Sequence, residues 1–175
     1  MKVNKLIKSK IERNYIFVKG ELEINAKYFI KKIEQGINES TNLNYRTNLV
    51  SPMTDWMYFM NDKIFYEIIF LLNDMIDKEK LSFGSGYMLS EAWGFKSDFG
   101  NYTKLHNHAS SIISGAIMLN EHAQELYFPD INEKLECKPG SFALFSGFLD
   151  HENKRNKSKK ARYGLSFNFK YQSAG

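Results

Sequence analysis

Residues 105–119 read LHNHASSIISGAIML, and this stretch decides the fold class. It places two histidines, His106 and His108, just before an apolar run typical of a strand. Because the chain has only four histidines, a pair separated by one residue at the mouth of a strand is a candidate metal site. If the segment is extended, both imidazoles lie on one face, since side chains on a strand repeat every two residues.

Short β-like runs recur from about Ser85 to the end of the chain, separated by turn signals such as KPGS at residues 138–141. Strands this short and this regularly spaced are typical of a barrel or jelly roll. Upstream, residues 26–40 and 62–80 carry apolar side chains at helical spacing, and we expect a long loop between them. The sequence thus predicts an α+β, mainly β fold, a double-sheet barrel backed by two N-terminal helices.

The chain shows no repeat and no proline-rich linker, so residues 1–175 are expected to form a single domain. We divide it into an N-terminal strand with supporting helices (1–84) and a barrel core (85–172). One cysteine, Cys137, excludes an internal disulfide and fits a reducing compartment. No apolar run approaches the roughly 20 residues that a membrane helix needs, so no membrane partner is expected. The expected location is the cytoplasm, or the host cytoplasm if the protein is viral.

A third metal ligand has to come from a distant point on the barrel. His151 is the best candidate, because it follows a turn and a buried strand in PGSFALFSGFLD. His122, in LNEHAQE, is expected to be a solvated hairpin residue. Three imidazoles suit Fe(II), Zn(II), Cu or Ni rather than Mg or Ca. The alternative is that His106 and His108 are merely hydrogen-bonded strand residues.

Arg162 follows His151 by eleven residues, at the start of the expected strand ARYGLSFNF. On that strand it would point into the barrel beside the metal. A buried guanidinium needs a planar anion, and a carboxylate fits its fork. A 2-oxo acid with a distal carboxylate meets both requirements, since its keto acid end chelates a metal. The alternative is that Arg162 simply ends the charged loop before it.

In these segments the chain resembles the Fe(II)/2-oxoglutarate-dependent dioxygenases, and among them a small family of oxygenases of marine phages and bacteria. The pieces that carry the resemblance are AWGF (92–95), HNHASSIISGAIML (106–119), QELYFPD (124–130), KPGSFALFSGFLDH (138–151) and ARYGLSFNF (161–169). They occur in the family's order and cover a little under half of the chain. The resemblance implies a double-stranded β-helix with Fe(II) near one end, 2-oxoglutarate as co-substrate and O2 as oxidant.

The resemblance also implies roles for single residues. His106 and His151 match the two histidine ligands, and His108 stands where the superfamily usually has Asp or Glu. Either His108 completes an all-histidine triad, or it stands aside and water fills its place. Arg162 matches the arginine that binds the distal carboxylate of 2-oxoglutarate, and Ser166 lies where a hydroxyl could help it. Gly164 replaces the family's usual serine.

The expected activity is hydroxylation of a C–H bond, with succinate and CO2 as co-products and no catalytic residue beyond the metal ligands. Trp93 and Phe95 are candidates to line the pocket, although core packing is the simpler role. Two alternatives stay open: a three-histidine iron dioxygenase that does not use 2-oxoglutarate, and a non-catalytic metal-binding barrel such as a phage accessory protein. The sequence names neither substrate nor oligomeric state; a protein side chain, a nucleobase and a small molecule all fit.

The loop at residues 153–162 carries six lysines and arginines, within a chain of formal net charge +4. We expect a solvated hairpin. The alternative is a lip that attracts an acidic substrate, phosphate or nucleic acid, although the loop lacks the interleaved aromatic residues of a base-stacking platform.

Overall fold

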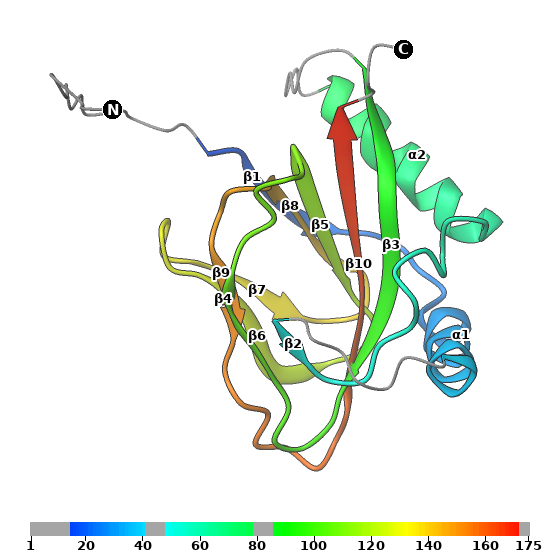
Figure 1. Cartoon of the computed structure of the whole chain (residues 1–175), viewed down its shortest axis with the longest axis vertical. Coiled ribbons are helices and arrows are strands. Elements are labelled where there is room, and N and C mark those ends of the chain that lie inside the picture. Colours follow the sequence, from blue (N-terminus) through cyan, green and yellow to red (C-terminus); the bar gives the residue numbers. More distant parts are fainter. Residues whose placement is uncertain (1–14, 41–47, 79–85, 172–175) are drawn as a thin grey trace, which may run out of the picture.

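The computed structural model describes residues 15–40, 48–78 and 86–171. Within these ranges, ten strands form two five-stranded antiparallel sheets packed face to face (Figure 1). The major sheet has the order β1 (Phe17–Glu21), β8 (Ser141–Ser146), β5 (Ile113–Met118), β10 (Arg162–Tyr171) and β3 (Tyr87–Ser97). The minor sheet has the order β2 (Leu49–Val50), β4 (Tyr102–His106), β9 (His151–Asn153), β6 (His122–Phe128) and β7 (Glu133–Cys137). The predicted α+β, mainly β double-sheet barrel is confirmed.

Two helices cover the outer face of the major sheet, as predicted (Figure 1). They are α1 (Ala26–Glu39) and α2 (Lys63–Lys78), close to the expected ranges, although residues 79 and 80 lie outside the described part. Asn25 caps α1 by accepting a hydrogen bond from the Tyr28 backbone N–H, and Asp62 does the same at Phe65. Each capping side chain marks the residue where its helix begins. None of the described helices is long and apolar enough to span a membrane.

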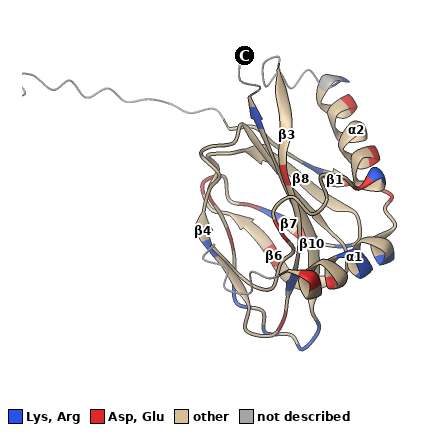
Figure 2. Ribbon diagram, turned by 45° about the vertical axis from the view of Figure 1, so that its right-hand side comes forward, with Lys and Arg blue, Asp and Glu red and all other residues tan. Residues whose placement is uncertain are grey.

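Both helices carry acidic and basic residues on their outer turns (Figure 2) and apolar residues beneath. Phe29 and Ile33 from α1, and Phe65 and Leu72 from α2, are fully buried against the sheet. The expected loop between the helices lies partly outside the described residues, which resume at residue 48. From there it contributes β2 and then packs on β3, where the Thr54 hydroxyl accepts a hydrogen bond from the Gly94 N–H at 3.0 Å.

Strand β10 lies between β5 and β3, and its side chains alternate between two environments. The outward set, Leu165, Phe167 and Phe169, joins the core beneath the helices. The inward set, Arg162, Ser166 and Asn168, lines a cavity between the two sheets. The alternation therefore separates the apolar core beneath the helices from the cavity between the sheets, where the candidate site lies.

Replacing Phe65 by alanine should lower the free energy of unfolding by about 3–5 kcal/mol, because its fully buried ring contacts Phe59 before α2 and Phe167 on the sheet. Phe70 on the same helix is 79% exposed and provides the matched control. Phe70→Ala should change stability by no more than about 0.5 kcal/mol. Urea unfolding measures both values, and equal effects would contradict the placement of α2.

Candidate metal centre and cavity

Three histidines from two distant parts of the sequence meet at one end of the barrel. His106 ends β4 and His151 begins β9, and the two are direct partners across the strands. His108 joins them, so that one ligand nitrogen from each ring lies within 4.8 Å of the other two. The ring centroids are 4.3 to 5.1 Å apart. The predicted ligand set is therefore brought together, and this spacing fits a single metal ion.

The expectation that His108 shares a strand face with His106 is wrong. Strand β4 ends at His106, so His108 is not on the same strand face. It lies in the following turn, where its backbone N–H donates to the Gly147 carbonyl at 2.6 Å and its carbonyl accepts from the Ser111 N–H at 2.7 Å. Gly147 is required there, because a Cβ at this position would lie 2.0 Å from the Ser111 carbonyl oxygen. The turn, not the strand, directs the His108 ring to the cluster.

All three imidazoles are neutral at pH 7. Burial lowers the pKa of His106, lowers that of His108 to about 4, and lowers that of His151 well below its usual range. The neutral ring is the form that binds metal ions. The cluster is therefore ready to bind a metal ion without first losing protons.

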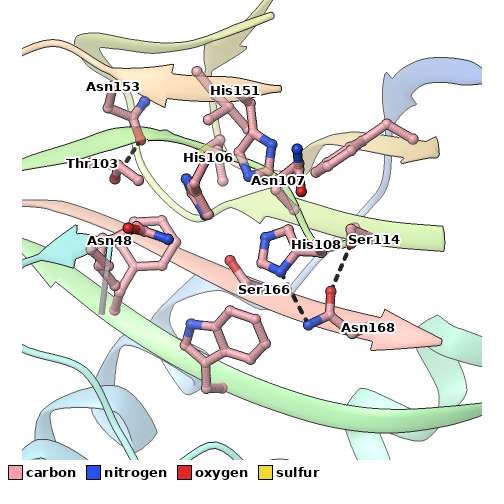
Figure 3. A pocket seen from close by; sticks show the side chains of 18 of the residues that line it. Asn48, Thr103, His106, Asn107, His108, Ser114, His151, Asn153, Ser166 and Asn168 are labelled. Atoms are coloured by element: carbon pink, nitrogen blue, oxygen red, sulfur yellow. Dashed lines mark hydrogen bonds between the residues drawn. The ribbon is translucent and has the colours of Figure 1, made fainter. Parts of the chain in front are cut away.

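A cavity of about 280 Å³ extends from the histidines into the barrel (Figure 3). The four other residues proposed from the sequence all line it: Trp93, Phe95, Arg162 and Ser166. The Ser166 hydroxyl projects toward the histidines (Figure 3). Among the described lining residues, the only titratable or charged side chains are the three histidines and Arg162. The rest of the wall is apolar or carries neutral amides and hydroxyls.

Arg162 is 1% exposed, and its guanidinium has only neutral partners among the described residues. One terminal nitrogen donates to the Asn153 amide oxygen at 2.9 Å. The other lies 3.5 Å from the Gln124 carbonyl and 3.9 Å from two sulfurs. The Phe95 ring lies 4.9 Å from the guanidinium carbon, and Nε has no hydrogen-bond partner. A buried cation without an anion is costly, and an acidic ligand at this end of the cavity would offset that cost.

His122 lies outside the cluster. It begins β6, where the expectation was a solvated hairpin. Its ring is partly buried, and both ring nitrogens form hydrogen bonds. Nε2 lies 2.9 Å from the Lys160 carbonyl oxygen, and Nδ1 accepts from the Gln124 backbone N–H at 2.9 Å. His122 therefore anchors the basic loop to the barrel rather than lying free in solvent.

Among the lining residues that were not found from the sequence are Trp56, Asn153 and Asn168. The period-two rule could have found both asparagines, because Asn153 follows His151 by two residues and Asn168 follows Arg162 by six on the same strand face. Trp56 comes from the loop after β2 and carries no such signal. Its ring meets that of Trp93 edge to face at 4.6 Å, at the rim of the cavity.

The same fold occurs in solved structures of 2-oxoglutarate and Fe(II) oxygenases. The 2OG complex of the viral collagen prolyl hydroxylase of Paramecium Bursaria Chlorella virus-1 matches with 15% identity and a TM-score of 0.69, over 90% of this chain and 96% of that one. A Pseudomonas putida prolyl-4-hydroxylase matches with 13% identity and a TM-score of 0.64, over 90% and 93%. HygX from Streptomyces hygroscopicus, solved with nickel and 2-oxoglutarate bound, matches with 12% identity and a TM-score of 0.62, over 91% and 83%.

No family model and no curated protein matches the sequence. At these identities the structural matches establish the fold. The chain has the double-stranded β-helix of the 2-oxoglutarate and Fe(II) oxygenases, as the resemblance implied. Nearly the whole of the viral hydroxylase is covered, so the likeness extends to the helices as well as to the barrel.

The metal-free protein should lose stability as the pH falls below about 6.5. Because the pKa of His108 is lowered to about 4 in the fold, the unfolded chain binds a proton that the folded chain does not. This one group should cost roughly 2 kcal/mol between pH 6.5 and 5. Urea unfolding at several pH values measures it. His108→Gln should flatten the slope by that amount, and an unchanged slope would contradict the burial of the ring.

Proposed function

We propose that this chain is an Fe(II)- and 2-oxoglutarate-dependent dioxygenase that hydroxylates a C–H bond of its substrate. The observation that carries the proposal is Arg162, a fully buried guanidinium with no carboxylate partner among the described residues, in the same cavity as three clustered histidines. A metal site alone would not need this cation. A 2-oxo acid with a distal carboxylate accounts for both features, and O2 is the oxidant.

The residues present fit these groups. His106 and His151 each keep a ring nitrogen free for the metal, since their other nitrogen donates to a backbone carbonyl. When bound, the iron and 2-oxoglutarate supply the activation of O2 and the release of succinate and CO2. Arg162 would bind the distal carboxylate, assisted by Ser166. Asn153 holds the guanidinium in place, and its own amide oxygen also accepts from Thr103 (Figure 3).

The composition of the cavity wall favours a substrate whose reacting group is uncharged. Among the described residues that line it, none is a lysine, aspartate or glutamate. Trp93 is 5% exposed and Trp56 is 39% exposed, so the pair forms an aromatic wall from the interior to the rim. We infer that the substrate presents a neutral carbon-bearing group, from a protein side chain, a nucleobase or a small molecule, and packs it against this wall.

The contacts of the basic loop at residues 153–162 favour a role in attracting the substrate over a role in binding nucleic acid. One of the cations of this loop, Arg155, is already engaged. Its guanidinium lies 4.7 Å from the centre of the Tyr102 ring and donates to the Gly100 carbonyl. Asn156 is buried and bonds the Ser97 carbonyl, which fixes the loop to the barrel. With Tyr102 covered, the loop lacks a free ring on which a base could stack.

Anaerobic titration with Fe(II) and 2-oxoglutarate tests the proposal. The wild type should give a visible charge-transfer band that needs both additives, and slow 2-oxoglutarate turnover in air. 2-Oxopentanoate has the same keto acid end but no distal carboxylate. It should bind about 10- to 100-fold more weakly, because it lacks the charged hydrogen bonds to Arg162.

Arg162→Met should abolish this preference for 2-oxoglutarate over 2-oxopentanoate. Arg155→Met, on the neighbouring loop, is the matched control and should keep it. Circular dichroism verifies that both variants are folded. If wild type bound iron but did not distinguish the two keto acids, the proposed co-substrate would be wrong, and the three-histidine dioxygenase would replace it. If no iron were bound, the barrel would not be an oxygenase.

A further inference from the structure

The three histidines of the cluster are not held in the same way. The Nδ1 of His106 lies 2.8 Å from the Lys104 carbonyl oxygen, and the Nδ1 of His151 lies 3.0 Å from the Leu149 carbonyl oxygen. A carbonyl oxygen only accepts, so in both rings Nδ1 carries the proton and Nε2 keeps its lone pair. This is the usual arrangement of a metal-binding histidine.

His108 faces a donor instead of an acceptor. Its Nδ1 lies 3.4 Å from Nδ2 of Asn168 (Figure 3), and an amide nitrogen only donates. A hydrogen bond forms between these atoms only when Nδ1 of His108 has the lone pair. The proton of the neutral ring is then on Nε2, and a protonated nitrogen does not bind a metal ion.

The orientation of the Asn168 amide follows from its other two contacts. Its Nδ2 lies 2.7 Å from Oε2 of Glu91, and its Oδ1 accepts from the Ser114 hydroxyl at 2.7 Å. Turning the amide around would place Oδ1 against the carboxylate, two acceptors in contact. A hydroxyl tolerates either orientation, but a carboxylate does not.

Glu91 is itself fixed from the other side. Its Oε1 lies 3.6 Å from the Lys170 ammonium. Glu91 and Asn168 are also direct partners across β3 and β10. The chain of contacts therefore runs from Lys170 through Glu91 and Asn168 to His108.

We propose that Glu91 and Asn168 are positioning residues that keep the His108 proton on Nε2. His106 and His151 are then the two protein ligands of the metal ion. His108 donates an N–H hydrogen bond to whatever oxygen atom or anion fills the third position, which is open to water or to part of the substrate. This inference rests on the proposed function, and it assigns His108 a role different from that of the other two histidines.

Glu91→Gln should reverse the arrangement. A glutamine amide nitrogen can donate, so the Asn168 amide is free to turn and present Oδ1 to His108. The His108 proton then moves to Nδ1, and Nε2 becomes available as a third metal ligand. Glutamine has nearly the shape of glutamate and the side chain is about 30% exposed, so folding should be little affected.

Nitrogen-15 NMR of the imidazoles in metal-free protein at pH 7.5 tests the inference directly, and needs no activity. The wild type should show His108 protonated on Nε2, and His106 and His151 protonated on Nδ1. In Glu91→Gln, the His108 proton should appear on Nδ1 while the other two rings stay unchanged. A wild-type His108 protonated on Nδ1 overturns the proposal.

Cobalt(II) affinity in a double-mutant cycle gives the second readout. His108→Ala should change the Kd less than about 3-fold in wild type, but weaken it about 10-fold or more in Glu91→Gln. His151→Ala should weaken binding strongly in both backgrounds and is the control for a true ligand. If His108→Ala and His151→Ala weaken wild-type binding equally, His108 is a ligand and the inference is wrong. If wild type binds no cobalt, the proposed function fails, and the NMR result still decides the His108 tautomer.

Discussion

The two-residue alternation of β10 is the constraint on which the rest of the structure depends. One set of side chains, Leu165, Phe167 and Phe169, joins the apolar core under the helices, while the other set, Arg162, Ser166 and Asn168, faces the second sheet. A shift of one residue would place the arginine among the phenylalanines beneath the helices and turn the core side chains into the cavity. The same register that stabilises the fold therefore places the cation and the amide in the cavity.

The cation then determines what the cavity can hold. A guanidinium removed from water costs several kcal/mol unless an anion or a full set of acceptors replaces the water. Here the acceptors are incomplete, since Nε has no partner and Cys137 contributes only a weak contact through sulfur. Burial also lowers the pKa of Arg162, because the loss of water destabilises the charged guanidinium. A bound carboxylate would offset this cost, and a ligand that binds only the folded barrel would stabilise it.

Sequence reasoning reached those parts of the site that follow from local periodicity. His106 and Arg162 lie on strands, and the direction of their side chains follows from strand spacing. The direction of His108 could not be derived, because a turn held by Gly147 sets it. The link between Asn168 and Glu91 crosses 77 residues of sequence and depends on the pairing of two strands. Strand pairing has no signal in a single sequence, so the contacts that distinguish one histidine from another appeared only in the fold.

Those contacts also distinguish the proposed oxygenase from the two alternative functions. A three-histidine dioxygenase needs a lone pair on each ring facing the metal, and it has no use for a buried arginine. Backbone carbonyls leave such a lone pair on His106 and on His151, but Asn168 presents a donor to His108. A barrel that only held a structural metal would have no need to leave Arg162 without an anion. The orphaned guanidinium and the unequal histidines favour the same assignment, a centre with two histidine ligands that leaves room for a chelating co-substrate and for one further ligand.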